Sequence, residues 1–140
     1  MKHLLSLVLV LLLFAVSCKQ SVDKTIAFFG VHISGIEYEI IDKYNRWIPF
    51  NGNGESYLQL SLSKMDNDGV KQIAEQMINN GAQELPLKNR DIIISDRLNH
   101  YYSYEDGLYI LKVDSTDARD YYLMILDETK KEIIILIIDE

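Results

Sequence analysis

The sequence predicts an α+β fold: an antiparallel sheet of about five to seven strands, with one amphipathic helix packed on a face. Three observations favour this class. Short segments rich in strand formers are separated by turn signals such as Asn-Gly and Asp-Gly. A single segment, residues 68–80, places apolar residues at helical spacing. Residues 26–140 have the length of one domain and show no internal repeat.

The first seventeen residues have the layout of a secretory signal peptide. Lys2 and His3 precede residues 4–17, a run of fourteen residues without a charge. A membrane-spanning helix needs roughly 20 apolar residues, and polar residues follow this run at once. We therefore expect residues 1–17 to be a signal that is cleaved during export.

The end of this stretch, Ala15-Val16-Ser17-Cys18, resembles the lipobox of bacterial lipoproteins. The resemblance implies that Cys18, the only cysteine, becomes the mature N-terminus and carries the lipid anchor. Ala15 departs from the leucine that is usual at its position. Ala15 and Ser17 also suit an ordinary signal peptidase, which would leave Cys18 as a lone thiol. Lys19 stands where an Asp would imply retention at the inner membrane, so the resemblance implies the outer membrane.

After the signal, residues 18–25 are expected to form the lipidated cysteine and a polar tether, and residues 26–140 a single domain. Loss of the signal removes one basic residue and leaves 13 basic against 21 acidic residues, a net charge of −8. Such a surface is unsuited to nucleic acid, because phosphates are bound by Lys and Arg. Anionic lipid heads would also repel it, so we expect the lipid to provide the contact with the membrane.

The domain is predicted to begin with a hairpin. Residues 26–33 are rich in strand formers, and Ser34-Gly35 is a turn signal. Residues 36–41 then alternate between apolar and charged side chains, which is typical of a half-buried strand.

A second pair of strands is predicted around the loop of residues 46–55. This loop contains Trp47 and two successive Asn-Gly pairs, which favour a tight reversal of the chain. Residues 56–63 alternate, and one face of the segment carries Leu58, Leu60 and Leu62. The loop is therefore expected to join two antiparallel strands.

Residues 68–80 are predicted to form the helix. The apolar stripe follows i, i+3, i+4, i+7, i+8 spacing and consists of Val70, Ile73, Ala74, Met77 and Ile78. Asp66 or Asp68 can cap the start of the helix. Gly81 can close its end, because glycine accepts the left-handed conformation at that position.

Two further hairpins are predicted in the C-terminal half. Residues 101–104 and 108–113 flank an Asp-Gly turn signal, and residues 121–126 and 132–138 flank a polar turn. The last of these segments does not alternate, which favours a central strand covered on both faces. Residues 91–95 are expected to form a short strand or a turn of helix.

The sequence points to no cofactor, metal site or catalytic residue. His32 and His100 each lie alone, whereas a zinc site needs three or four ligands. Residues 51–55 and 64–75 hold only part of a calcium-loop pattern. The residue types of a hydrolase triad occur within eight residues, at Asp96, His100 and Ser103. Triads are normally assembled from distant segments, so this set does not predict catalysis.

Aromatic residues are the better candidates for a binding surface. The candidates are Trp47, Tyr101, Tyr102, Tyr104 and Tyr109. Exposed Tyr and Trp side chains are favoured at interfaces, because they bury a large area and have few rotors to fix. The alternative is that these residues pack in the core, since aromatic residues also favour strands.

Residues 34–38, Ser-Gly-Ile-Glu-Tyr, resemble the Ser-Gly-x-x-Tyr motif of the small periplasmic lysozyme inhibitors. The resemblance implies that Ser34 and Tyr38 approach the catalytic carboxylates of a lysozyme. It covers five residues, and the second motif of that family is not reproduced at residues 129–131. The mature chain also resembles small uncharacterised envelope lipoproteins, through the loop after Trp47 and the C-terminal hairpin.

Taken together, these features predict a non-catalytic lipoprotein of the cell envelope, anchored by its N-terminal lipid, that binds an envelope protein or a glycan. One alternative is an inhibitor of an envelope-directed enzyme, such as lysozyme, or of a toxin. A small hydrolase is the remaining alternative.

Overall fold

The computed structural model describes residues 21–47, 54–88, 96–117 and 119–139. The expected signal and Cys18 lie outside these residues, as do the segment 91–95 and most of the loop after Trp47. Within the described part of the chain, no helix has both the length and the apolar character needed to cross a membrane.

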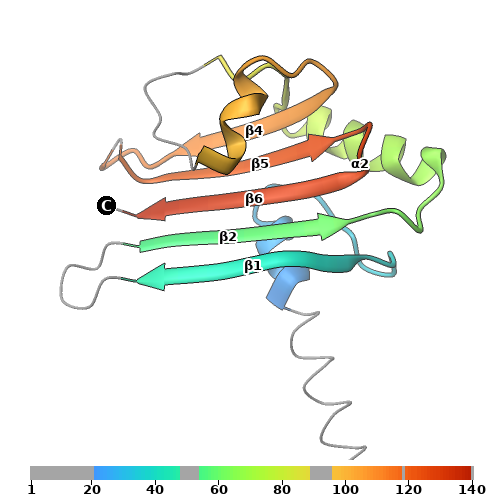
Figure 1. Ribbon diagram of the computed structural model, residues 1–140, viewed down its shortest axis with the longest axis horizontal. Helices are drawn as coiled ribbons and strands as arrows, with labels where there is room; N and C mark the ends of the chain where they lie inside the picture. The colour runs from blue at the N-terminus through green and yellow to red at the C-terminus, as the bar shows by residue number, and fades with distance from the viewer. Residues whose placement is uncertain (1–20, 48–53, 89–95, 118, 140) are drawn as a thin grey trace, which may run out of the picture.

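The described strands form one antiparallel sheet (Figure 1). They are β1 (Glu39–Trp47), β2 (Gly54–Ser61), β3 (Gln83–Glu84), β4 (Gly107–Val113), β5 (Tyr121–Asp127) and β6 (Glu132–Asp139). Their order across the sheet is β1-β2-β6-β5-β4-β3, and every neighbouring pair is antiparallel. The C-terminal strand therefore lies in the middle of the sheet, between β2 and β5. The predicted α+β class with an antiparallel sheet is confirmed.

Two of the predicted strand pairs are present as hairpins. β1 pairs with β2 across the predicted loop, in the register that places Asn45 opposite Ser56. β1 covers residues 39–47, whereas the sequence predicted a strand over 36–41 and a loop from residue 46. β5 and β6 form the predicted last hairpin, with Asp127 opposite Glu132 beside the turn.

Two apolar clusters are divided by the sheet. The first cluster comprises Val22, Ile26, Phe29, Val31, Ile33, Leu58, Leu60, Leu62, Val70, Ile73, Ala74, Met77, Leu108, Ile110, Met124, Leu126, Ile133 and Ile135. The second cluster comprises Tyr57, Leu85, Leu87, Leu98, Tyr101, Tyr109, Tyr121, Leu123, Ile125, Ile134 and Leu136. Successive residues of a strand point to opposite faces, so β6 supplies alternate residues to the two clusters. This burial on both sides confirms the prediction of a central, doubly covered strand.

Residues 21–27 are helical and already belong to the folded domain. Val22 and Ile26 are 2% and 0% exposed, and both lie in the first cluster with Phe29. The structure differs here from the expected polar tether and from the expected first hairpin. The reason is the i, i+4, i+7 spacing of these three residues, which gives a short helix one fully buried face.

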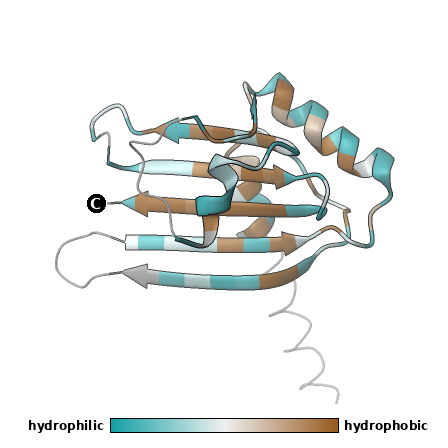
Figure 2. Cartoon of the chain, turned by 45° about the horizontal axis from the view of Figure 1, so that its top comes forward, coloured by the Kyte–Doolittle hydropathy of each residue, from teal (hydrophilic) through white to brown (hydrophobic). Residues whose placement is uncertain are grey.

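The predicted helix is α2 (Asn67–Asn79), which carries both hydrophilic and hydrophobic residues (Figure 2). The Asp66 side chain caps it by accepting a 2.7 Å hydrogen bond from the Gly69 N–H. Gly81, with φ +85°, follows the helix in the left-handed region, as predicted. Four residues of the predicted stripe are buried: Val70, Ile73, Ala74 and Met77. The fifth, Ile78, differs from the prediction because 57% of it is exposed.

Polar side chains of α2 and of its C-cap residue, Asn80, hold the segment that follows residues 21–27. The Gln76 side chain accepts a 2.8 Å hydrogen bond from the His32 N–H. The Asn80 side-chain amide donates to the Gly30 carbonyl at 3.0 Å. These bonds fix the start of the domain against the central helix.

A 3₁₀ helix, η1 (Asp96–Tyr102), includes residues 101 and 102 of the segment 101–104 that was predicted as the first strand of a hairpin. Leu98 and Tyr101 are 1% and 0% exposed and lie in the second cluster. A 3₁₀ helix has three residues per turn, so this i, i+3 pair points to one side and is buried together. β4 therefore pairs with β5 and β3 and not with residues 101–104.

Candidate functional site

A groove of about 680 Å³ runs between α2 and the corner where β4 begins. It is lined by four residues of α2, by Glu84 of β3, by residues 105–108 and by residues 128 and 129 of the β5–β6 turn. These segments are far apart in the sequence and are brought together by the sheet order β5-β4-β3. The groove has a larger volume than the hollows of about 230 and 180 Å³ elsewhere on the described residues, so we take it as the candidate site.

Carboxylates dominate the rim of this groove. They belong to Glu75, Glu84, Glu105, Asp106 and Glu128, and each of these residues is exposed. Lys71 is the basic residue of the lining, and its ammonium lies 3.9 Å from an Asp68 carboxylate oxygen. Like charges in such a rim repel one another and attract a cation. The groove therefore has the charge to receive a positively charged group.

The remainder of the lining consists of Thr129 and apolar residues. Ala74 and Leu108 are buried, while Ile78 is more than half exposed at the edge of α2. Gly107 allows the start of β4 to lie close to β5, since a Cβ on it would lie 2.1 Å from the Leu126 carbonyl oxygen, and its φ is +154°. A partner with both cationic and apolar groups would match this lining.

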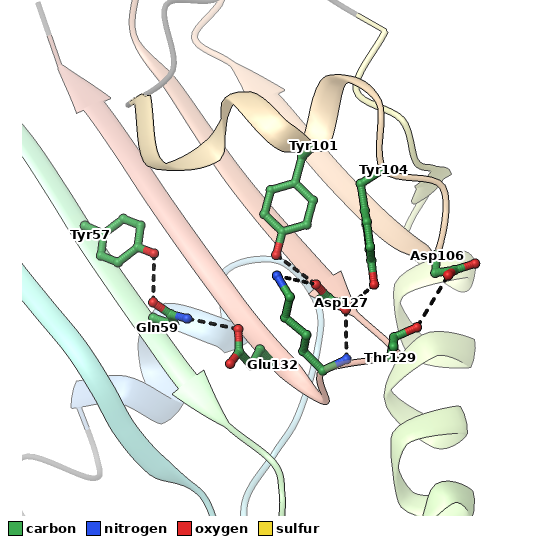
Figure 3. Close-up of polar contacts among 9 residues, drawn as sticks. Tyr57, Gln59, Tyr101, Tyr104, Asp106, Asp127, Thr129 and Glu132 are labelled. Carbon is green, nitrogen blue, oxygen red and sulfur yellow. Dashed lines mark hydrogen bonds and ion pairs between the residues drawn. The ribbon is translucent and has the colours of Figure 1, made fainter.

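A buried carboxylate fixes the turn that forms one wall of the groove (Figure 3). Asp127 is 0% exposed and accepts hydrogen bonds from the Tyr101 hydroxyl at 3.0 Å and the Tyr104 hydroxyl at 2.9 Å. It also accepts from the Lys130 backbone N–H at 2.9 Å, and the Lys130 ammonium lies 3.4 Å away. Burial, and then the charge of Asp127, raise the pKa of Tyr101. The Tyr101 hydroxyl therefore stays protonated and acts as a donor to the carboxylate.

The same network reaches the groove through Thr129. The Thr129 hydroxyl donates to Asp106 at 3.5 Å, so the turn after β5 is linked to the segment before β4 (Figure 3). A second polar chain lies across β2 and β6, where Gln59 joins the Tyr57 hydroxyl to Glu132. This second chain does not line the groove.

The structure corrects the predicted aromatic surface. Tyr101 and Tyr109 are 0% and 3% exposed and belong to the second cluster, so they are core residues. Each hydroxyl has a partner inside the domain, and that of Tyr109 donates to Gln83 at 2.7 Å. Tyr102 and Tyr104 are half-buried and pack against the same cluster. Of these four tyrosines, none presents a fully exposed ring.

Trp47 lies at the end of β1, and its side chain is outside the described part of the structure.

The residues of the inhibitor-like motif lie in the segment before β1. Ser34 is exposed in a turn in which Gly35 has φ +84°. Tyr38 is half-buried, packs against the first cluster and donates a 3.3 Å hydrogen bond to Asp23. The two side chains are therefore held in different environments, one in solvent and one against the N-terminal helix.

The hydrolase residue types do not form a relay. The Ser103 hydroxyl donates to the backbone carbonyl of His100 at 3.2 Å. The Asp96 carboxylate accepts from the Asn99 amide at 3.1 Å. Among the described residues, no three His, Cys, Asp or Glu side chains are placed so that they could hold a metal ion.

Comparisons of the chain with protein-family models, with curated proteins and with solved structures found no match. Function is therefore inferred from the groove, the charge of the domain and the sequence of the N-terminus.

Proposed function

We propose that this protein is a lipid-anchored lipoprotein of the cell envelope, on the outer membrane, whose domain is a non-catalytic binding module. The anchor is proposed from the signal layout of residues 1–17 and from its end at Cys18. Val22, four residues after Cys18, is 2% exposed, so the folded domain reaches to within four residues of the proposed anchor. The domain would then sit directly beside the bilayer.

We further infer that α2 packs on the sheet face that carries the first cluster. Its four buried residues belong to that cluster together with residues of β2, β4, β5 and β6. On this arrangement Ile78 falls at the margin of the packed face, which explains why it is exposed in the groove.

The groove is proposed to hold a cationic segment of an envelope protein. The observation that carries this proposal is the rim of five exposed carboxylates around a hollow that also exposes Ile78. A neutral glycan would gain little from such a rim, whereas a basic segment gains charge complementarity and a faster encounter.

Peptide binding tests this proposal. The probe is a fluorescent hexalysine with one central leucine, measured against the acylated full chain in a nonionic detergent with a detergent-only blank. We expect binding that weakens with salt, because exposed charges are screened within about 8–10 Å at 0.1–0.15 M salt. Glu75→Lys should raise the Kd about tenfold, equivalent to ~1.4 kcal/mol.

Glu37→Lys is the matched control, since Glu37 is also exposed and lies outside the groove. It should leave the Kd within about twofold of the parent, as expected for a charge outside the contact. Equal losses of peptide affinity in the two variants would show a response to net charge alone. Binding of a hexaglutamate peptide with the same Kd would rule out a cationic ligand.

A further inference from the structure

A second, smaller cavity of about 230 Å³ lies beside the N-terminal helical segment, residues 21–27. Its walls come from that segment, from the middle of β1 and β2 and from β6. It lies on the face of the first cluster, because Val22, Leu58 and Ile135 belong to that cluster and Ile137 packs against it.

The lining of this cavity is amphiphilic. Its floor is apolar and consists of Val22, Leu58, Ile135 and Ile137. Its rim is polar, and there the Ser56 hydroxyl donates to the Asn45 side-chain oxygen at 2.6 Å. The volume is below the roughly 300–1,000 Å³ of pockets for drug-sized ligands. A narrow apolar floor with a polar mouth suits a slim hydrocarbon chain that ends in a polar group.

The position of the cavity in the chain indicates which hydrocarbon would occupy it. Ser21 lines the cavity and is three residues from Cys18. Three residues span at most about 10 Å when fully extended. Any lipid carried by Cys18 is therefore attached within reach of the cavity mouth.

We propose that this cavity holds the terminal part of one acyl chain of the lipid on Cys18. The inference rests on the proposed function, because it requires Cys18 to be acylated. An acyl chain that inserts between the N-terminal segment and the sheet would fix the domain relative to its own anchor. The domain would then be held in one orientation at the membrane surface rather than swinging on a linker.

Photocrosslinking of the full-length protein in cells tests this inference. Cells are fed a palmitate analogue that carries a diazirine near the chain end, and they are then irradiated. The protein is purified, and its crosslinked sites are mapped by mass spectrometry. We expect the label on Cys18 and crosslinks to peptides of β2 and β6. Label on Cys18 without crosslinks to these strands would overturn the inference and leave the lipid anchor intact. No label on Cys18 would overturn the proposed anchor and this inference together.

Two blocking variants and one control sharpen the result. Thr25→Trp and Asn45→Trp each place an indole at the cavity rim, from the helical segment and from β1. Both variants should reduce the crosslinks to β2 and β6 about fivefold. The control is Ala27→Trp, because Ala27 is exposed on the same helical segment and lies outside the cavity. It should leave these crosslinks unchanged. Crosslinks that persist in Cys18→Ser would assign the cavity to free membrane lipid and contradict the proposal.

Discussion

Asp127 is the fully buried charged residue among the described residues. It fixes the β5–β6 turn, which forms one wall of the groove. A buried carboxylate is costly unless its oxygens accept hydrogen bonds or pair with a cation. Asp127 meets this requirement with two tyrosine hydroxyls, a backbone N–H and the Lys130 ammonium. The Lys130 side chain is 47% exposed, so solvent weakens its share and the hydrogen bonds supply most of the stabilisation.

Replacement of this carboxylate tests its importance. In Asp127→Asn the charge is lost and one acceptor oxygen becomes a donor that faces the tyrosine hydroxyls. We expect the free energy of unfolding to fall by about 1–3 kcal/mol, since a buried group is left poorly paired. Asp106→Asn is the matched control: it is exposed with one long bond to Thr129, and should cost less than about 0.5 kcal/mol. Urea unfolding of both variants measures the difference, and equal losses would contradict a special role for Asp127.

The tyrosines show what the sequence does not reveal at the residue scale. A tyrosine can lie in a binding surface or in a core, because it has an apolar ring and a polar hydroxyl. This holds for Tyr101, Tyr102, Tyr104 and Tyr109. The choice depends on whether a buried acceptor is available. For Tyr101 that acceptor is Asp127, 26 residues further along the chain, and no local pattern announces such a partner.

At the scale of elements, local signals were sufficient for α2, β2 and the β5–β6 hairpin. The apolar stripe of α2, the alternation of β2 and the polar turn between β5 and β6 all lie within short windows of sequence. The helical segment of residues 21–27 and η1 were missed. The helical segment had a signal in the spacing of Val22, Ile26 and Phe29. The strand formers from Ile26 onward instead favoured the two-residue period of a strand. The i, i+3 pair of η1 is too short to distinguish from a strand.

The cap of α2 gives a prediction at this scale. The sequence allowed either Asp66 or Asp68, and the structure assigns the hydrogen bond to Asp66. Asp66→Ala should lower the free energy of unfolding by about 0.5–2 kcal/mol. Asp68→Ala removes an exposed charge in the first turn and its 3.9 Å ion pair with Lys71, so we expect a smaller loss of about 0.3–1 kcal/mol. Thermal unfolding of the two variants compares them, and a larger loss for Asp68→Ala would contradict the assigned cap.

At the scale of the whole molecule, topology explains why the groove could not be predicted. Its lining comes from α2, β3, the start of β4 and the β5–β6 turn, which span residues 71–129. They meet because β6 inserts between β2 and β5 and leaves β4 and β3 at one edge of the sheet. Sequence patterns specify strands but not this order. The acidic excess was visible in the composition, but its concentration around one hollow was not.

The anchor is the feature of the whole molecule on which the proposed function depends. An acidic domain gains no binding energy from anionic lipid heads, so its attachment to the membrane would come from acyl chains. Each buried methylene of such a chain contributes about 0.8 kcal/mol. Val22 already belongs to the core of the described domain, so little chain lies between such an anchor and the domain.

Metabolic labelling with radioactive palmitate, followed by separation of the inner and outer membranes, tests the anchor most directly. The parent and Cys18→Ser are expressed side by side in the same strain. We predict that the parent incorporates the label and is recovered with the outer membrane, and that Cys18→Ser incorporates none and leaves that fraction. An unlabelled parent, or a Cys18→Ser protein that remains in the outer membrane as the parent does, would contradict a lipid anchor on this cysteine.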